Sequence, residues 1–193
     1  RDVSLNTGTM VSKALRSKGH NVIMLDVFMG YHEEEEDITD IFNHTEEASA
    51  DVAQIPGEAP DIAQVKAMRK DQSACFFGPN VIKICQAADI VFMALHGENG
   101  ENGKIQAAFD LFGIQYTGSR YLGSALAMDK GISKKMFEAA GIPTPHGIAM
   151  SKTQRHTPFS ETGLTLPCVV KPCCGGSSIG VTIVRTADEY EAA

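Results

Sequence analysis

Apolar and polar positions alternate with a helical period from the first residues of the chain. Apolar side chains from Val3 to Leu15 recur every three or four positions, which predicts an amphipathic helix with one buried stripe. Gly19 is the expected C-cap of this helix, and the apolar run over residues 22–25 predicts a buried strand. A helix that leads into a parallel strand usually follows another strand, so we expect the parent chain to begin before Arg1.

From residue 78 onward the pattern predicts alternating helices and strands. A helix is expected over 79–87, followed by a continuous apolar run over 89–95 that is typical of a parallel strand covered on both faces. A second helix is expected over 105–112, and a short strand over 114–116. This alternation predicts an α/β fold, in which the first domain has a doubly wound parallel sheet.

The pattern changes after residue 120. Two helical pieces are expected between residues 121 and 140, and the Gly- and Pro-rich segment 141–145 ends them. Two β-type runs, 168–172 and 181–184, flank a glycine-rich loop at 173–180, which predicts an antiparallel hairpin.

The remaining segments are a last helix and an irregular stretch. The helix is expected to begin near Asp188, with Thr186 as its N-cap. Residues 30–75 are less regular, and the acidic run 33–37 predicts a solvated surface loop. A metal site there is discounted, because adjacent carboxylates cannot all converge on one ion.

Composition changes this picture only through the classes of protein that it excludes. The chain has 193 residues, is 43% hydrophobic and carries a formal net charge of −7, which suits a soluble globular protein of one domain or two small ones. This acidity argues against a nucleic-acid partner. No apolar run approaches about 20 residues, the length that crosses a bilayer, so no membrane partner is expected.

The five cysteines indicate a reducing compartment rather than a disulfide framework. Their number is odd and none has C-x-x-C spacing, so we expect a cytoplasmic protein. Cys168, Cys173 and Cys174 come nearest to a cluster, but their spacing is poor for zinc, and ordinary packing is expected instead.

The glycine-rich loop carries the most informative chemistry. Its glycines let backbone N–H groups approach an anion, two serine hydroxyls add donors, and Lys171 stands at its entrance. The alternative is a plain hairpin turn beside a surface lysine. The loop is neither a Walker A motif nor G-x-G-x-x-G, and its formal G-x-S-x-G match at 176–180 precedes a strand rather than the helix that a hydrolase elbow needs.

Other positions leave their roles open on pattern alone. His96 ends a buried apolar run, where it is either a satisfied residue at the edge of the core or a functional side chain. The glycines of 97–103 favour function, because a helix entered through glycines offers free N–H groups. Lys130, Lys134 and Lys135 are either a solvated helix face or a source of cations for a site.

Several short motifs follow one another in a characteristic order. They are His96-Gly97, Gly100-Glu101-x-Gly103-x-Ile105-Gln106, Tyr116-Thr117-Gly118-Ser119, Ser124-Ala125, Met128-Asp129-Lys130, Val170-Lys171-Pro172 and Gly176-Ser177-Ser178-x-Gly180. In this order they resemble the D-alanine–D-alanine ligases of the ATP-grasp superfamily, and so many motifs in register argue against chance similarity.

This resemblance implies a fold and a reaction. An N-terminal α/β domain of the pre-ATP-grasp type would span residues 1–120, and an α+β ATP-grasp domain would begin within 121–193. Family members join two D-alanines with ATP and Mg²⁺, through an acyl phosphate that the amine of the second D-alanine attacks. The product, D-alanyl-D-alanine, serves peptidoglycan synthesis, cell-wall biogenesis and cell shape, and the full-length protein would be a cytoplasmic homodimer.

The resemblance also implies roles for single residues of the ATP side. Lys130 and Lys171 match the two lysines that hold the ATP phosphates, and the loop 173–180 matches the lid over them. Ser177 matches the serine that orients the second substrate and its general-base chemistry. The other loop residues expected to bind phosphate are Gly175, Gly176 and Ser178.

On the substrate side the resemblance implies four residues. His96 and Glu101 match a motif near the dipeptide site, and Val3 and Ser4 stand in the segment after the family's first glycine-rich turn.

The sequence departs from the family pattern in several places. Asn102 replaces a common Asp, and Cys173 and Cys174 stand where relatives often carry a charged residue. The family's N-terminal catalytic glutamate would precede Arg1, while its Mg²⁺ ligands and catalytic arginine would follow Ala193. We therefore expect no metal ligands within this polypeptide and no ligation by it alone.

Three alternative functions stay open. D-Ala–D-Lac and D-Ala–D-Ser ligases are the nearest, because acceptor choice depends largely on residues after Ala193. A different ATP-grasp carboxylate–amine ligase is the second, and His96-Gly97 and the 116–119 motif count against it. The third is a non-catalytic nucleotide-binding module, which the two lysines and the loop serine disfavour.

Overall fold

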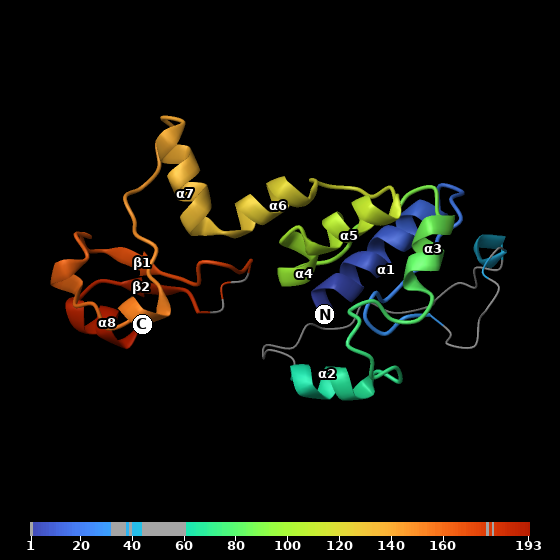
Figure 1. Cartoon of the computed structure of the whole chain (residues 1–193), viewed down its shortest axis with the longest axis horizontal. Coiled ribbons are helices and arrows are strands. Elements are labelled where there is room, and N and C mark those ends of the chain that lie inside the picture. The colour runs from blue at the N-terminus through green and yellow to red at the C-terminus, as the bar shows by residue number, and fades with distance from the viewer. Residues whose placement is uncertain (1, 32–37, 39, 44–60, 177, 179) are drawn as a thin grey trace. The chain divides into compact units, whose positions relative to one another are not determined.

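The computed structural model describes residues 2–31, 38, 40–43, 61–176, 178 and 180–193 (Figure 1). The chain divides into two compact units, and each has its own architecture. The first unit comprises Arg1–His96 and Ile105–Gly118, and the second comprises Gly97–Lys104 and Ser119–Ala193. The acidic run 33–37 lies outside the described residues. No helix within them is long and apolar enough to cross a membrane.

The named elements of the first unit, within its described residues, are helices. They are α1 (Asp2–Arg16), the 3₁₀ turn η1 (Ile41–Asn43), α2 (Ile62–Met68), α3 (Val81–Ala87) and α5 (Lys104–Phe112). The helices α1, α3 and α5 confirm their predictions. The buried apolar stripe expected on α1 is wrong, because Val3 and Met10 are exposed and the buried residues of this helix are Thr9 and Ser12. α1 ends as expected, because Gly19 adopts a φ of 86° and its N–H donates to Arg16 O over 2.9 Å.

α2 lies where the sequence predicted no regular element. The carboxylate of Asp61 caps it by accepting two backbone N–H groups of its first turn. Directly after α2, the buried Arg69 donates to Cys75 O over 2.6 Å and to Phe77 O over 3.1 Å, and it pairs with Asp71 at 2.7 Å. The guanidinium of Arg69 therefore fixes the loop that brings Phe77 to the core.

The core of the first unit forms between α3 and α5. Its apolar residues face one another because each helix carries one apolar stripe. The ring of Phe109 on α5 is stacked on Phe77, with centroids 6.1 Å apart, and is tilted against Tyr116 at 5.9 Å. The buried members of this cluster are Val81, Cys85, Ile105, Phe109 and Ile114.

The doubly wound parallel sheet expected in this unit is not seen in the part of the chain that the structure describes. One parallel bridge joins Val91 to Tyr116: Val91 N–H donates to Gln115 O over 2.8 Å, and Thr117 N–H donates to Val91 O over 3.0 Å. The next N–H, of Met93, donates to the Thr117 hydroxyl instead of a carbonyl, so the ladder stops. Val91, Met93 and Leu95 still pack against the core. Ile90 and Phe92 are exposed, so the expectation that the run 89–95 is covered on both faces is wrong.

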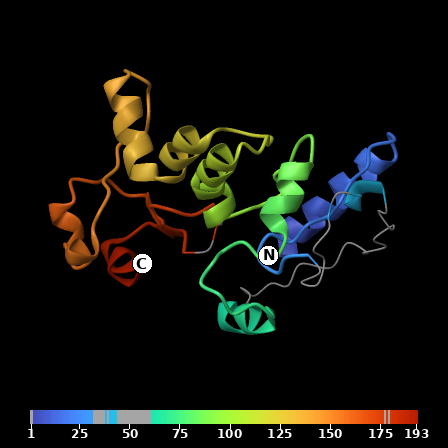
Figure 2. The same cartoon turned by 45° about the vertical axis from the view of Figure 1, so that its right-hand side comes forward.

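The second unit combines helices with a small hairpin. Its elements are α4 (Glu98–Glu101), α6 (Tyr121–Met128), α7 (Lys130–Ala139), the 3₁₀ turns η2 (Lys152–Gln154) and η3 (Phe159–Glu161), β1 (Cys168–Val170), β2 (Thr182–Val184) and α8 (Ala187–Ala192). Both views show the chain change direction sharply between α6 and α7 (Figures 1 and 2). Asp129 is the residue at this bend, and it ends α6 and caps α7.

The antiparallel hairpin and the last helix confirm their predictions. Strands β1 and β2 pair with Cys168 opposite Val184 and Val170 opposite Thr182. The hydroxyl of Thr186 caps α8 by accepting the backbone N–H of the helix's first turn over 3.2 Å. The hairpin therefore holds the glycine-rich loop between two paired strands.

Replacing Phe109 with Ala should destabilise the first unit strongly. Its ring is 0% exposed, so the change removes buried contacts and leaves a cavity that costs about 3–5 kcal/mol of unfolding free energy. The matched control is Leu111→Ala on the same helix, whose side chain is 88% exposed and whose loss should cost about 0.5 kcal/mol or less. Denaturant unfolding measures both, and equal losses would show that the core is misassigned.

The thiol of Cys85 should resist alkylation in the folded chain. Burial raises its pKa to about 11 from an ordinary value of 9.0, so the reactive thiolate is scarce at pH 8. Since only the unfolded state ionises between pH 9.0 and about 11, this thiol lowers stability as the pH rises through that window and has no such effect below it. Iodoacetamide labelling followed by peptide mass spectrometry should show the exposed Cys75 modified well before Cys85. Labelling of both at one rate in the native chain would contradict this.

Candidate functional site

Lys130, the first residue of α7, is joined to the glycine-rich loop by its main chain and its side chain. Its backbone N–H donates to Cys173 O over 3.1 Å, and Asp129 and Cys174 form an isolated antiparallel bridge. Its ammonium nitrogen Nζ donates to Gly175 O over 2.7 Å and to Cys173 O over 3.3 Å. The structure thus brings together two sequence-predicted parts of the site, Lys130 and the loop, across 43 to 45 positions of the sequence.

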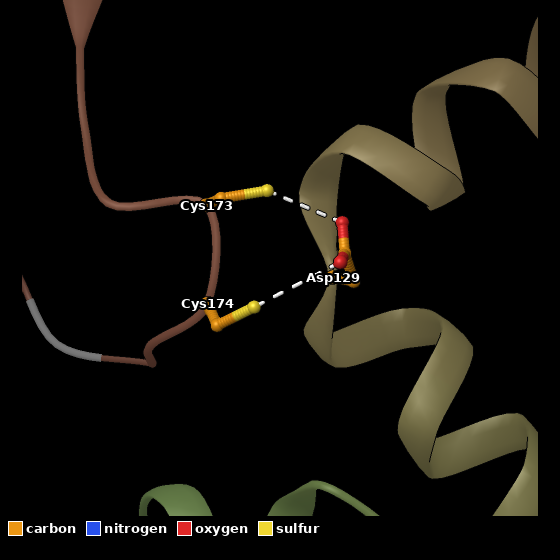
Figure 3. Close-up of side chains that lie close together, drawn as sticks. All are labelled: Asp129, Cys173 and Cys174. Carbon is orange, nitrogen blue, oxygen red and sulfur yellow. Dashed lines mark hydrogen bonds between the residues drawn. The ribbon is translucent and has the colours of Figure 1, made fainter. Parts of the chain in front are cut away.

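Asp129 organises the same contact from the helix side (Figure 3). Its Oδ1 accepts the Ile132 N–H over 2.9 Å as the N-cap of α7, and the Cys173 thiol donates to the same oxygen over 3.2 Å. The Cys174 thiol donates to Oδ2 over 3.9 Å. The N–H of Ile132, and then the thiol of Cys173, hold the pKa of Asp129 below its usual value. Desolvation, and then the hydrogen bond to Asp129, raise the pKa of Cys173.

Lys171 follows β1 directly and is exposed. Among the residues that the structure describes, it makes no hydrogen bond or ion pair, so its ammonium group is free to meet an anion. Gly175, at a φ of 145°, and Gly176 carry no side chain that would keep an anion from the backbone. Ser178 is exposed beside them, whereas Ser177 lies outside the described residues.

Glu101, at the end of α4, lies beside the loop. Its Oε2 accepts the N–H of Gly97, the N-cap of α4, over 2.9 Å. A Cβ placed on Gly176 would stand 3.0 Å from this same oxygen. Glu101 and Gly176 are therefore neighbours, although 75 positions separate them in the sequence.

The substrate-side residues of the first unit meet at His96. The His96 N–H donates to Ser4 Oγ over 3.0 Å, and the ring nitrogen Nε2 lies 3.0 Å from Thr7 Oγ1. Val3, the residue before Ser4 on α1, is exposed. Sequence reasoning missed Thr7, which helical spacing could have indicated, because residues three positions apart lie on one face of a helix.

Sequence reasoning also gave Gly103 no structural role beyond its motif. This glycine has a φ of 86°, and a Cβ there would overlap the carbonyl oxygen of Tyr121 at the start of α6. The close approach lets α4 and α6 come together, so Gly103 supports the position of Glu101.

In the second unit a glycine-rich loop is thus bonded to one lysine, Lys130, while a second lysine, Lys171, stands at its entrance. Two family models match the chain: "D-ala D-ala ligase N-terminus" over residues 1–119 and "D-ala D-ala ligase C-terminus" over residues 136–193. The chain therefore belongs to the D-alanine–D-alanine ligase family, as its motifs indicated.

Individual relatives agree with this membership. The D-alanine–D-alanine ligase of Lacticaseibacillus casei is 39% identical over 99% of this chain and 52% of its own length. That of Pediococcus pentosaceus is 42% identical over 100% of this chain and 54% of its own. The crystal structure of the Bacillus anthracis ligase complexed with ATP superposes with a TM-score of 0.52 and 38% identity, over 58% of this chain and 36% of that one. The chain thus spans about half the length of the curated relatives it matches.

Replacing Gly103 with Ala should destabilise the second unit more than the same change at Gly141. Both glycines have positive φ, 86° and 68°, which costs about 1–2 kcal/mol with Ala. Only Gly103 also meets a backbone atom, and the shift needed there should cost about 1–3 kcal/mol more, whereas Gly141 has no neighbour within 4 Å. Thermal unfolding of the two variants measures the difference, and equal melting temperatures would contradict the close approach.

Proposed function

We propose that this chain holds the ATP phosphates and one side of the D-alanine site in an ATP-dependent D-alanine–D-alanine ligase of peptidoglycan synthesis. The observation that carries the proposal is the pair of lysines at the glycine-rich loop. Lys130 is bonded to loop carbonyls, and Lys171 has no partner among the described residues. Family membership supports the same reaction.

The chemistry of this donor set fits a polyphosphate. Phosphoryl transfer depends on positioning and on cations near the transferred group more than on covalent chemistry from the protein. When bound, ATP supplies the phosphoryl group that activates a carboxylate. Lys171 would neutralise phosphate charge, while Lys130 would hold the loop whose N–H groups bind phosphate oxygens.

Ser4 and His96 would serve the amino-acid substrate. Their mutual hydrogen bond fixes the main chain at the end of the apolar run 89–95, and Thr7 accepts or donates at the imidazole ring. The role of Ser177 in orienting the second D-alanine remains our prediction from the family motif. Mg²⁺ as the partner of ATP, and a homodimer of the full-length protein, belong to the same proposal.

Replacing Lys171 with Met should weaken ATP binding by about 10- to 150-fold, because a charge-assisted hydrogen bond contributes about 1.5–3 kcal/mol. Isothermal titration calorimetry with ATP and with AMP measures the effect. AMP affinity should change little, because the loss falls on the β- and γ-phosphates.

The matched control is Lys135→Met, an exposed lysine on α7 with no hydrogen bond among the described residues. It should bind ATP as the unchanged chain does. Equal losses in the two variants, or no ATP binding by the chain, would contradict the proposed phosphate site. Titration with D-alanine against L-alanine tests the substrate class separately.

A further inference from the structure

Three side chains with metal-binding atoms meet where α7 contacts the segment after β1 (Figure 3). They are Asp129, Cys173 and Cys174, and their ligand atoms all lie within 4.8 Å of one another. Both thiols point to the same carboxylate, at 3.2 Å from Oδ1 and 3.9 Å from Oδ2. The two cysteines are exposed, so an ion can reach the cluster from solvent.

We propose that Asp129, Cys173 and Cys174 form a site for one zinc ion. In tetrahedral zinc, with bonds of about 2.3 Å to sulfur and about 2.1 Å to oxygen, neighbouring ligands stand about 3.6–3.8 Å apart. The three ligand atoms already lie within 4.8 Å of one another, so side-chain rotations would bring them to this spacing. Two thiolates select zinc over Mg²⁺ and Ca²⁺, which prefer oxygen ligands. With three protein ligands, water takes the fourth position.

The charge around the cluster also suits a divalent cation. Two thiolates and one carboxylate carry −3, which Zn²⁺ reduces to −1. The ammonium of Lys130, bonded to the carbonyls of Cys173 and Gly175, is adjacent and offsets the remaining charge. A bound ion would join the start of α7 to the loop at the place where Lys130 already joins them.

The sequence predicted no metal ligand in the chain, and the spacing of Cys168, Cys173 and Cys174 is poor for zinc. In the structure Cys168 lies in β1 and takes no part in the cluster. The third ligand is instead Asp129, 44 positions before Cys173. The inference does not depend on the proposed function, because none of the three side chains is assigned to nucleotide or D-alanine.

The experiment is a zinc titration of the reduced 193-residue chain against a chromophoric chelator. We expect one zinc per chain. Cys173→Ser and Cys174→Ser should each weaken binding at least about 100-fold, since even changes behind a metal ligand cost 10- to 100-fold. Cobalt(II) in place of zinc should give a sulfur-to-metal charge-transfer absorption, which each single variant weakens and the Cys173→Ser/Cys174→Ser double variant loses.

Two further variants separate coordination from folding. Asp129→Asn keeps the cap of α7, because Asn caps helices as well as Asp does, yet it removes the charged ligand and should weaken zinc binding. Cys75→Ser changes an exposed cysteine of the first unit and should leave the affinity unchanged. Absence of zinc binding by the unchanged chain, or binding that survives the Cys173→Ser/Cys174→Ser double variant, would overturn the proposal.

Discussion

The hydrogen bond from Lys130 N–H to Cys173 O is the contact on which the second unit's site depends. It joins the first turn of α7 to the segment that leaves β1, so one contact fixes both a helix start and one end of the glycine-rich loop. The side chain of Lys130 extends the contact to Gly175 O, and Asp129 caps the helix from the neighbouring position. Charged donors make stronger hydrogen bonds than neutral ones, which is why a lysine suits this place.

Helices α1, α3, α5 and α8 and the hairpin could be predicted from the sequence because their signals are local. The helical period from Val3 to Leu15, the stop at Gly19 and the cap at Thr186 each act within a few residues, and the structure has the helix, its end and the cap. Which face of α1 is buried depends on its tertiary neighbours, and there the buried residues are Thr9 and Ser12. The parallel sheet could not be predicted in the same way. A hydropathy pattern does not specify which faces of an apolar run are covered, and Ile90 and Phe92 are exposed. Nor does it specify the partner of Met93 N–H, which is the Thr117 hydroxyl.

The residues of the candidate site also differ in how far the sequence predicts them. Family motifs predicted Lys130 and the glycine-rich loop as separate parts of one site, and the structure adds that the two are in contact. Asp129 belongs to one of those motifs, yet its contact with Cys173 spans 44 positions, and no spacing rule reaches that far. The role of Thr7 could have been predicted, because it lies three residues after Ser4 on the face of α1 that contacts His96.

The geometry of trans peptides decides how the loop can meet an anion. A trans peptide points its C=O and the following N–H in opposite directions. Because the carbonyls of Cys173 and Gly175 both point to Lys130 Nζ, the N–H groups of Cys174 and Gly176 point away from that nitrogen. An ammonium group has three donors, and these two carbonyls use two of them, so one remains. Lys130 therefore holds the loop with two donors and keeps a third, which in the proposed site would meet one phosphate oxygen.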